Sequence, residues 1–228
     1  REVSGCTMVV AAGEGQVQLG LREGGQIAVT PVADELALLA GRNCTLGFRL
    51  EETPTQVAEG LRYHASHHGL EGALIVNRLP GDDSGAGFVA GLAAALAGVS
   101  ITVVVLDCPL PMGKPGMGPE NHVYLAPDAP GKDRMEAPAP DPWRSPLGEG
   151  LIYEIAKWRF LAHARAVLTL DVSDILCPPE PGAPSAFDLC DTAKHGVILL
   201  VGRRIYPWRV RPEREARLRR EARPRRAF

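Results

Sequence analysis

The chain has few aromatic residues and lacks any long apolar run. Only 5% of its 228 residues are Phe, Trp or Tyr. No stretch approaches the roughly 18 consecutive apolar residues that a membrane-spanning helix needs. The first residues also lack the charged segment followed by an apolar one that is typical of a secretion signal. From these absences we expect a cytoplasmic protein without a transmembrane segment.

Closely spaced cysteine pairs are missing as well. The chain has five cysteines, and none belongs to a Cys-x-x-Cys pair; they are Cys6, Cys44, Cys108, Cys177 and Cys190. Their number is odd, whereas a disulfide framework uses cysteines in pairs, and structural zinc sites usually draw on closely spaced ligands. The sequence therefore indicates neither a disulfide framework nor a zinc site.

The net charge of −2 is unevenly distributed along the chain. Residues 203–228 contain eleven Arg and three Glu, a net charge of +8, which leaves −10 for residues 1–202. A body that acidic repels the phosphates of nucleic acids. We therefore expect no nucleic-acid binding, except through the basic tail at 211–228.

From residue 44 onward, strand patterns alternate with helix patterns. Strands are predicted over 44–50, 72–77, 100–107, 166–170 and 197–201, and helices over 54–68, 87–97, 149–163 and 184–195. Repeated alternation of this kind predicts an α/β fold with a mostly parallel central sheet flanked by helices. Before the α/β part of the chain, residues 3–32 contain short strand patterns between glycines, which predict a small N-terminal β meander. Residues 34–40 are predicted to form a short helix.

These patterns predict three parts: an N-terminal β extension over 1–43, an α/β domain over 44–210 and the basic tail. Within the α/β domain, residues 108–147 contain ten prolines, so neither a helix nor an interior strand can run far. A loop of that length in a compact domain is usually functional or disordered. The apolar residues Tyr124, Met135 and Trp143 favour the functional interpretation.

The stretch that suggests chemistry is the apolar run 166–170, which ends in Asp171 and Asp174. Ligands of open α/β sheets bind outside the carboxyl ends of the strands. Carboxylates that project there can hold a divalent cation such as Mn²⁺ or Mg²⁺. The alternative is that both aspartates are solvated residues of a strand end and a turn.

With its elements in this order, the chain resembles the family 2-like glycosyltransferases of the GT-A type. Three stretches carry the likeness: Leu46-Gly-Phe-Arg-Leu-Glu-Glu52 with the helix and strand that follow to Asn77, Tyr153-Glu-Ile-Ala-Lys-Trp-Arg-Phe160 leading into 166–176, and 196–208. The likeness covers about residues 44–210. It implies a nucleotide-binding α/β sandwich that transfers a sugar from a nucleotide diphosphate to an acceptor, which stays unknown here.

The resemblance also implies site residues. Asp171 matches the first acid of the family's Asp-x-Asp motif, which holds Mn²⁺ or Mg²⁺ against the diphosphate. Asp174 takes the place of the following acid, whereas Ser173 falls where the second Asp is expected. As substrate-binding residues, the resemblance implies Glu51 or Glu52 near the base or ribose, and Asn77 and Asp107 at the ends of the next two strands. It gives no catalytic base.

Two other functions stay open, and one metal site is rejected. Gly81-Asp-Asp-Ser-Gly-Ala-Gly-Phe-Val-Ala-Gly91 opens a helix after a strand, and Asp107 ends the next strand, as in an NAD(P)-binding domain. The basic tail suggests a non-catalytic interaction protein. His64 and His68 have the spacing of two metal ligands, but residues 65 and 66 are Ala and Ser, so the Glu of a metalloprotease motif is absent.

Overall fold

The computed structural model describes residues 2–3, 6–7, 15–22, 24–78, 85–111, 141–143 and 149–202, with the backbone alone at 2–3, 6–7 and 149. Most of the proline-rich loop predicted over 108–147 and the whole tail at 211–228 therefore lie outside the described residues. The chain divides into two units, Arg1–Gly196 and Val197–Phe228. The predicted domain limits at 43 and 210 stay predictions.

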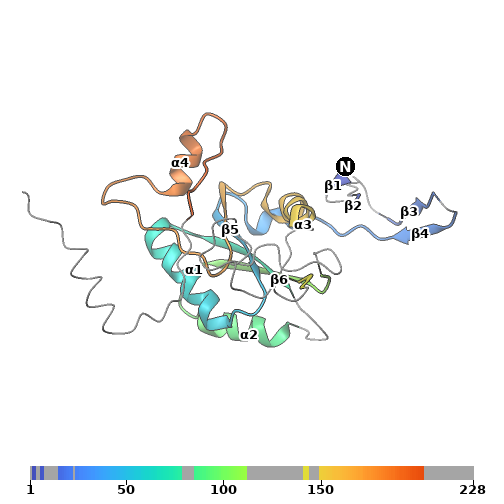
Figure 1. The fold of residues 1–228 in the computed structure, drawn as a ribbon, viewed down its shortest axis with the longest axis horizontal. Coiled ribbons are helices and arrows are strands. Elements are labelled where there is room, and N and C mark those ends of the chain that lie inside the picture. The colour runs from blue at the N-terminus through green and yellow to red at the C-terminus, as the bar shows by residue number, and fades with distance from the viewer. Residues whose placement is uncertain are drawn as a thin grey trace, which may run out of the picture. The chain divides into compact units, whose positions relative to one another are not determined.

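A four-stranded parallel sheet forms the centre of the first unit (Figure 1). Its strands are β5 (Asn43–Arg49), β6 (Gly72–Arg78), β7 (Thr102–Cys108) and β8 (Ala166–Thr169). The spatial order is β7-β6-β5-β8, and every neighbouring pair is parallel. Because the chain first moves from β5 to β6 and β7, and then returns to the other side of β5, the direction of the strand order reverses between β5 and β8.

Helices cover both faces of this sheet. On one face lie α1 (Pro54–His68), α2 (Ala86–Ala95) and α4 (Ala186–Thr192), and Figure 1 shows α1 and α2 side by side. On the other lie α3 (Glu149–Ala156), the π-helix η4 (Lys157–Leu161) and the 3₁₀ turn η1 (Leu36–Leu38). Side chains alternate along β6, which contributes Leu74 and Val76 to one core and Ala73 and Ile75 to the other, whereas the apolar side chains of β5 pack on the α3 side. The predicted α/β fold with a flanked parallel sheet is confirmed.

The sequence defines both ends of α1. Thr53 accepts a hydrogen bond from the backbone of Gln56, and the Gln56 side chain accepts one from the Thr53 backbone, which is a complete capping box. Pro54 follows in the first turn, where its missing N–H costs nothing. Gly69 ends the helix at a φ of 68°, a left-handed conformation that glycine adopts without strain.

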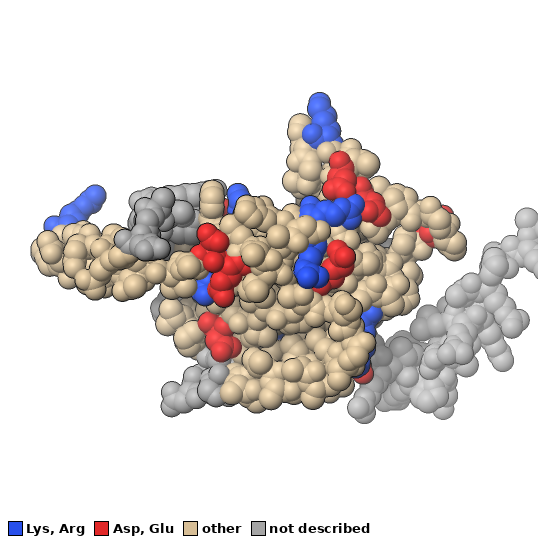
Figure 2. Space-filling model, turned by 180° about the vertical axis from the view of Figure 1, so that it is seen from behind, with Lys and Arg blue, Asp and Glu red and all other residues tan. Residues whose placement is uncertain are grey.

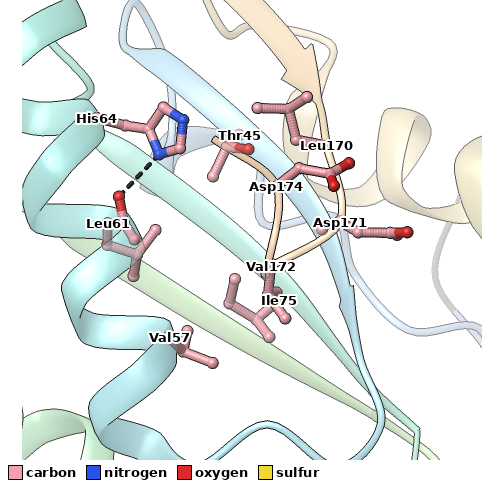
Figure 3. Close-up of a pocket in the computed structure, with 11 residues that line it drawn as sticks. Thr45, Val57, Leu61, His64, Ile75, Leu170, Asp171, Val172 and Asp174 are labelled. Carbon is pink, nitrogen blue, oxygen red and sulfur yellow. Dashed lines mark hydrogen bonds between the residues drawn. The ribbon is translucent and has the colours of Figure 1, made fainter. Parts of the chain in front are cut away.

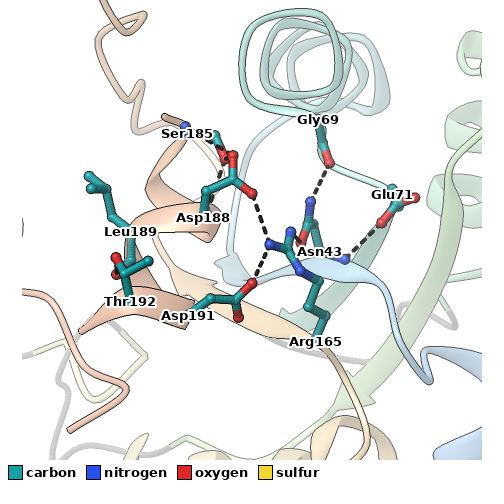
Figure 4. A network of polar contacts seen from close by, with 9 residues as sticks. All are labelled: Asn43, Gly69, Glu71, Arg165, Ser185, Asp188, Leu189, Asp191 and Thr192. Atoms are coloured by element: carbon teal, nitrogen blue, oxygen red, sulfur yellow. Dashed lines mark hydrogen bonds and ion pairs between the residues drawn. The ribbon is translucent and has the colours of Figure 1, made fainter. Parts of the chain in front are cut away.

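Arg165 ties α4 to the amino ends of the strands (Figure 4). Its guanidinium donates to Asn43 Oδ1 at 2.9 Å and to Asp188 Oδ1 at 2.8 Å, and it also pairs with Asp191. Asn43 in turn donates to the carbonyl of Gly69 at 3.0 Å. These contacts lower the pKa of Asp188, chiefly through the hydrogen bond from Arg165. One arginine therefore connects the starts of β5 and β8 with α4.

The N-terminal residues form two separate antiparallel pairs, β1 (Glu2–Val3) with β2 (Cys6–Thr7), and β3 (Val17–Gly20) with β4 (Gln26–Val29). They agree with the small N-terminal β structure predicted from sequence. In the second pair, Val17 lies opposite Val29 and Leu19 opposite Ile27.

Other predictions differ from the structure. Residues 197–201, predicted as a strand, form no strand, and Val197, Leu199 and Val201 are 69%, 93% and 99% exposed. The predicted helix 34–40 is reduced to the turn η1, and that over 149–163 changes into a π-helix at Lys157. The backbone N–H of Glu35 donates to the carbonyl of Arg159 in this π-helix at 2.7 Å. None of the helices described combines the length and the apolar character needed to span a bilayer.

Candidate functional site

A turn directly after β8 carries the two aspartates singled out from sequence. The backbone N–H of Asp174 donates to the carbonyl of Asp171 at 2.9 Å, which closes the acidic turn, residues 171–174. Because β8 pairs with β5, the turn lies at the carboxyl end of the sheet where the strand order reverses. Crevices at this point are where open α/β sheets bind ligands.

Two glycines let the acidic turn lie close to the sheet and to α1. A Cβ on Gly47 in β5 would lie 2.8 Å from the carbonyl oxygen of Leu170, and one on Gly60 in α1 would lie 3.3 Å from that of Val172. Both distances are shorter than ordinary contacts. The segment after β8, residues 170–176, therefore crosses β5 and packs on α1 at positions that only glycine fits without displacement.

Between this segment and α1 lies a small cavity (Figure 3). Its volume is about 20 Å³, enough for about one water molecule. Val57, Leu61 and Ile75 give it a largely apolar wall. In Figure 3 the carboxylates of Asp171 and Asp174 both point away from α1. A nucleotide therefore does not fit this cavity, and the carboxylates are directed to the other side of the turn.

The Asp171 carboxylate makes no hydrogen bond or ion pair with any described residue. Its pKa is raised, first because the surrounding atoms partly remove it from water, and then because Asp174 and Glu52 carry the same charge. Arg78 opposes this shift. Three carboxylates and one arginine thus act on one another here, and a cation would relieve the repulsion among the acids.

A second polar group lies at the carboxyl ends of β5, β6 and β7. Arg49 donates to Asn77 Oδ1 at 2.9 Å, and Asn77 donates to Asp107 Oδ1 at 2.7 Å. We call these three residues the edge row. They are also neighbours in the strand register, where Arg49 lies opposite Asn77 and Asn77 opposite Asp107. Asn77 is completely buried and uses its amide to join a cation to an anion.

The start of α2 closes over this edge row. Gly85 caps α2 at a φ of 65°, and a Cβ there would lie 2.8 Å from both Asn77 Nδ2 and Asp107 Oδ1. The ring of Phe88, one turn into α2, lies 4.4 Å from the guanidinium carbon of Arg49, which is a cation–π contact. The edge row is therefore covered by α2 on one side.

Glu52 connects the edge row with the acidic turn. The Arg49 side chain donates to the backbone carbonyl of Glu52 at 2.8 Å, and the Glu52 carboxylate accepts the backbone N–H groups of Leu50 and Glu51 at 2.9 and 3.2 Å. The same carboxylate raises the pKa of Asp171. Glu51 is exposed beside it. The loop between β5 and α1 thus places the Glu52 carboxylate near the acidic turn.

Of the residues predicted from sequence, Glu52, Asp171 and Asp174 are brought together at the reversal point, and Asn77 and Asp107 form the adjacent edge row. Sequence reasoning missed Arg49, Arg78 and Gly85. Arg49 lies within one of the stretches that carry the family resemblance, but its contacts depend on strand register, which a single sequence does not show. Arg78, 4% exposed, donates to the carbonyl of Pro142 at 3.4 Å.

The donor set limits how a divalent cation could bind. Among the described residues, no group of three or more His, Cys, Asp or Glu side chains is arranged to hold a metal ion. Mg²⁺ is commonly bound by one or two carboxylates together with substrate phosphates. Asp171 and Asp174 fit this second mode, in which the ion binds together with a diphosphate.

Comparisons with known proteins give this chain no relative. No protein-family model matches the sequence, no curated protein matches it, and no solved structure matches it. The class that the fold defines is an α/β protein with a four-stranded parallel sheet, and any function must be argued from the site itself.

Proposed function

We propose that this chain binds a nucleotide diphosphate sugar at the carboxyl edge of its sheet and acts as a glycosyltransferase on an unknown acceptor. The observation that supports this most is the position of the acidic turn: two carboxylates that make no hydrogen bond or ion pair with any described side chain lie at the point where the strand order reverses. Their mutual repulsion favours a bound cation, and a cation there favours a diphosphate.

In this proposal each polar group has a role. Asp171 and Asp174 hold Mn²⁺ or Mg²⁺, and when bound the metal neutralises the charge that grows on the departing diphosphate. Glu51 or Glu52 and the exposed carboxylate of Asp107 provide hydrogen-bonding groups for the nucleoside, while the buried Asn77 holds Asp107 in position. Arg78 lies close enough to Asp171 to influence its pKa and adds positive charge near the diphosphate. The catalytic base is not assigned.

This chain has the strand order of an NAD(P)-binding domain, but its turn after β5 differs from the glycine-rich turn that such a domain has there. In that class the glycine-rich turn follows the central strand at the reversal point and leads into a helix whose N-terminus binds the pyrophosphate. Here the corresponding turn follows β5 and contains Glu51 and Glu52, whose charges repel a pyrophosphate. The glycine-rich stretch follows β6 instead, and its residues 81–84 lie outside the described part of the chain.

A nucleic-acid partner is also less well supported. On the face shown in Figure 2, basic and acidic side chains of the described residues lie in small mixed groups between uncharged areas. Binding to a phosphate backbone favours a continuous basic surface. The basic tail, which lies outside the described residues, keeps this possibility open for a test.

The experiment is a thermal-shift and calorimetric titration with UDP, GDP, their sugars and NAD(P)H, each with and without Mn²⁺. We expect a nucleoside diphosphate or its sugar to bind only with the metal, and Asp171→Asn to weaken that binding at least tenfold. Asp34→Asn is the matched control, because Asp34 is an exposed carboxylate of the loop before η1.

Three results would contradict the proposal. Binding of NAD(P)H alone would support the dinucleotide alternative. Binding of nucleoside diphosphates that needs no metal and is unchanged by Asp171→Asn would show that the acidic turn is not the site. Binding of none of the compounds, with salt-sensitive RNA binding instead, would support the interaction protein.

A further inference from the structure

Three side chains of α1 bind the backbone of one residue just after the acidic turn. The hydroxyl of Tyr63 donates to the carbonyl of Leu176 at 2.9 Å, and His68 Nε2 donates to the same carbonyl at 3.1 Å. The backbone N–H of Leu176 donates to His64 Nε2 at 3.2 Å. We call Tyr63, His64 and His68 the Leu176 anchor.

The anchor fixes the protonation state of His64. Its Nδ1 lies 2.7 Å from the carbonyl of Gly60, one turn earlier in α1, so Nδ1 carries the proton and donates. Its Nε2 must therefore be a lone-pair acceptor for the Leu176 N–H. A proton on Nε2 would place two donors against each other. The bond to Leu176 thus exists only while His64 is neutral.

The histidines of the anchor are buried, and its rings are closely packed. His64 and His68 are 7% and 4% exposed, and the ring of Tyr63 meets that of His64 edge-on, with centroids 5.2 Å apart. Nδ1 of His68 is buried and has no hydrogen-bond partner among the residues that the structure describes. Burying an unsatisfied nitrogen costs stability. An apolar residue at position 68 would avoid that cost but could not bind the carbonyl of Leu176.

We propose that the Leu176 anchor positions the acidic turn for ligand binding and holds it less firmly when His64 becomes protonated, because the bond from the Leu176 N–H is then lost. The segment that carries Asp171 and Asp174 is held at its start by the pairing of β8 with β5 and at its end by this anchor. The role of the turn in ligand binding rests on the proposed function, whereas the attachment of the segment to α1 does not.

The groups around His64 favour its neutral form. Burial lowers its pKa most, and the neighbouring His68 and His67 lower it further, while the bond to Gly60 acts in the other direction. The strands behind it contribute uncharged residues to the shared cavity, and the acids on the facing segment are Asp171 and Asp174, which point away from α1 in Figure 3. The bond from the Leu176 N–H to His64 is therefore lost only below pH 6.5, because the pKa of His64 is lowered from this ordinary value.

The test is hydrogen–deuterium exchange of peptides spanning 170–177 in the full chain, because it does not depend on any ligand. At pH 7.5 we expect His64→Leu to speed exchange of these amides about five- to tenfold, the effect of losing one hydrogen bond. His67→Leu is the matched control. His67 is on the same helix and exposed, and its Nδ1 contacts Ser66 and the carbonyl of Tyr63 rather than Leu176. Its ring stacks on Tyr63 with centroids 4.3 Å apart, so this variant also measures how much of the effect comes from packing around Tyr63.

The pH arm separates a positioning role from simple packing. The difference in exchange between wild type and His64→Leu should shrink toward zero as the pH falls through the lowered pKa of His64, because the wild-type bond is then lost as well. Equal exchange in His64→Leu and His67→Leu, or a difference that stays constant from pH 7.5 down to the onset of acid unfolding, would overturn the proposal. Tyr63→Phe, which keeps the ring, gives a second readout if His64→Leu fails to fold.

A nucleotide titration of the same variants completes the test. If wild type binds a nucleoside diphosphate with metal, His64→Leu should weaken that binding and His67→Leu should not. Unchanged affinity despite faster exchange would refute the role of the anchor in ligand binding. If wild type binds no nucleotide, the proposed function fails, and the exchange data alone decide whether the anchor holds the segment.

Discussion

Replacing Gly47 by alanine tests the packing on which the site depends. The new Cβ would lie 2.8 Å from the carbonyl oxygen of Leu170 and 3.1 Å from Cγ1 of Val172. Leu170 cannot move away freely, because its N–H donates to the carbonyl of Leu46 at 3.2 Å and the preceding residues pair with β5. Overpacking at a fixed site costs about 1–3 kcal/mol.

Thermal unfolding measures this cost. For a chain of this size, 1 kcal/mol shifts Tm by about 2–4 °C, so we expect Gly47→Ala to lower Tm by about 2–12 °C. The control is Gly20→Ala, because Gly20 is also a strand glycine and its added Cβ would meet nothing within 4 Å. If both variants melt within a degree of each other, the segment after β8 does not cross β5 as described.

Two further predictions concern the two ends of the sheet. Gly85→Ala should lower the free energy of unfolding by about 1–3 kcal/mol, since it combines a left-handed φ with a Cβ placed against two polar atoms. Gly87→Ala is the control, because a Cβ there meets open space in the same helix. Equal urea midpoints for the two variants would contradict the account of the edge row. Arg165→Ala should free α4 and speed hydrogen exchange over 186–192, with a smaller difference from wild type in 1 M salt, because exposed charges are screened. The contribution of Asp188, whose pKa is lowered, should be present above pH 4 and lost as the pH falls further, so the wild-type advantage should vanish in acid. A salt-independent difference would show that packing rather than charge holds α4.

The fold could be predicted because its strands are apolar runs between helices with clear ends. Thr53, Pro54 and Gly69 mark α1, and the buried strand β6 is apolar except at its last two residues. The same rule failed at 197–201. An apolar run predicts a strand only if a neighbouring strand is available to pair with it, and a sequence pattern does not show whether one is.

Less of the candidate site than of the fold could be predicted from the sequence. Asp171 and Asp174 follow a recognisable strand, so their place at the sheet edge could be predicted. The roles of Arg49 and Gly85 could not, because they depend on which strands are neighbours and on their register. The Leu176 anchor was missed for a related reason: the helical spacing of the histidines was recognised, but their partner lies more than 100 residues later in the chain.

The pairing of β5 with β8 also bears on how the protein reaches its native state. Asn43 pairs with Ala166, 123 positions later, whereas β5, β6 and β7 follow one another closely along the chain. Contacts between distant residues are slow to form because a long loop must close first. During synthesis the first three strands can assemble before β8 leaves the ribosome. The acidic turn then reaches the sheet only after β8 has paired with β5, so a partly folded chain would have three strands of the sheet without the carboxylates at its edge.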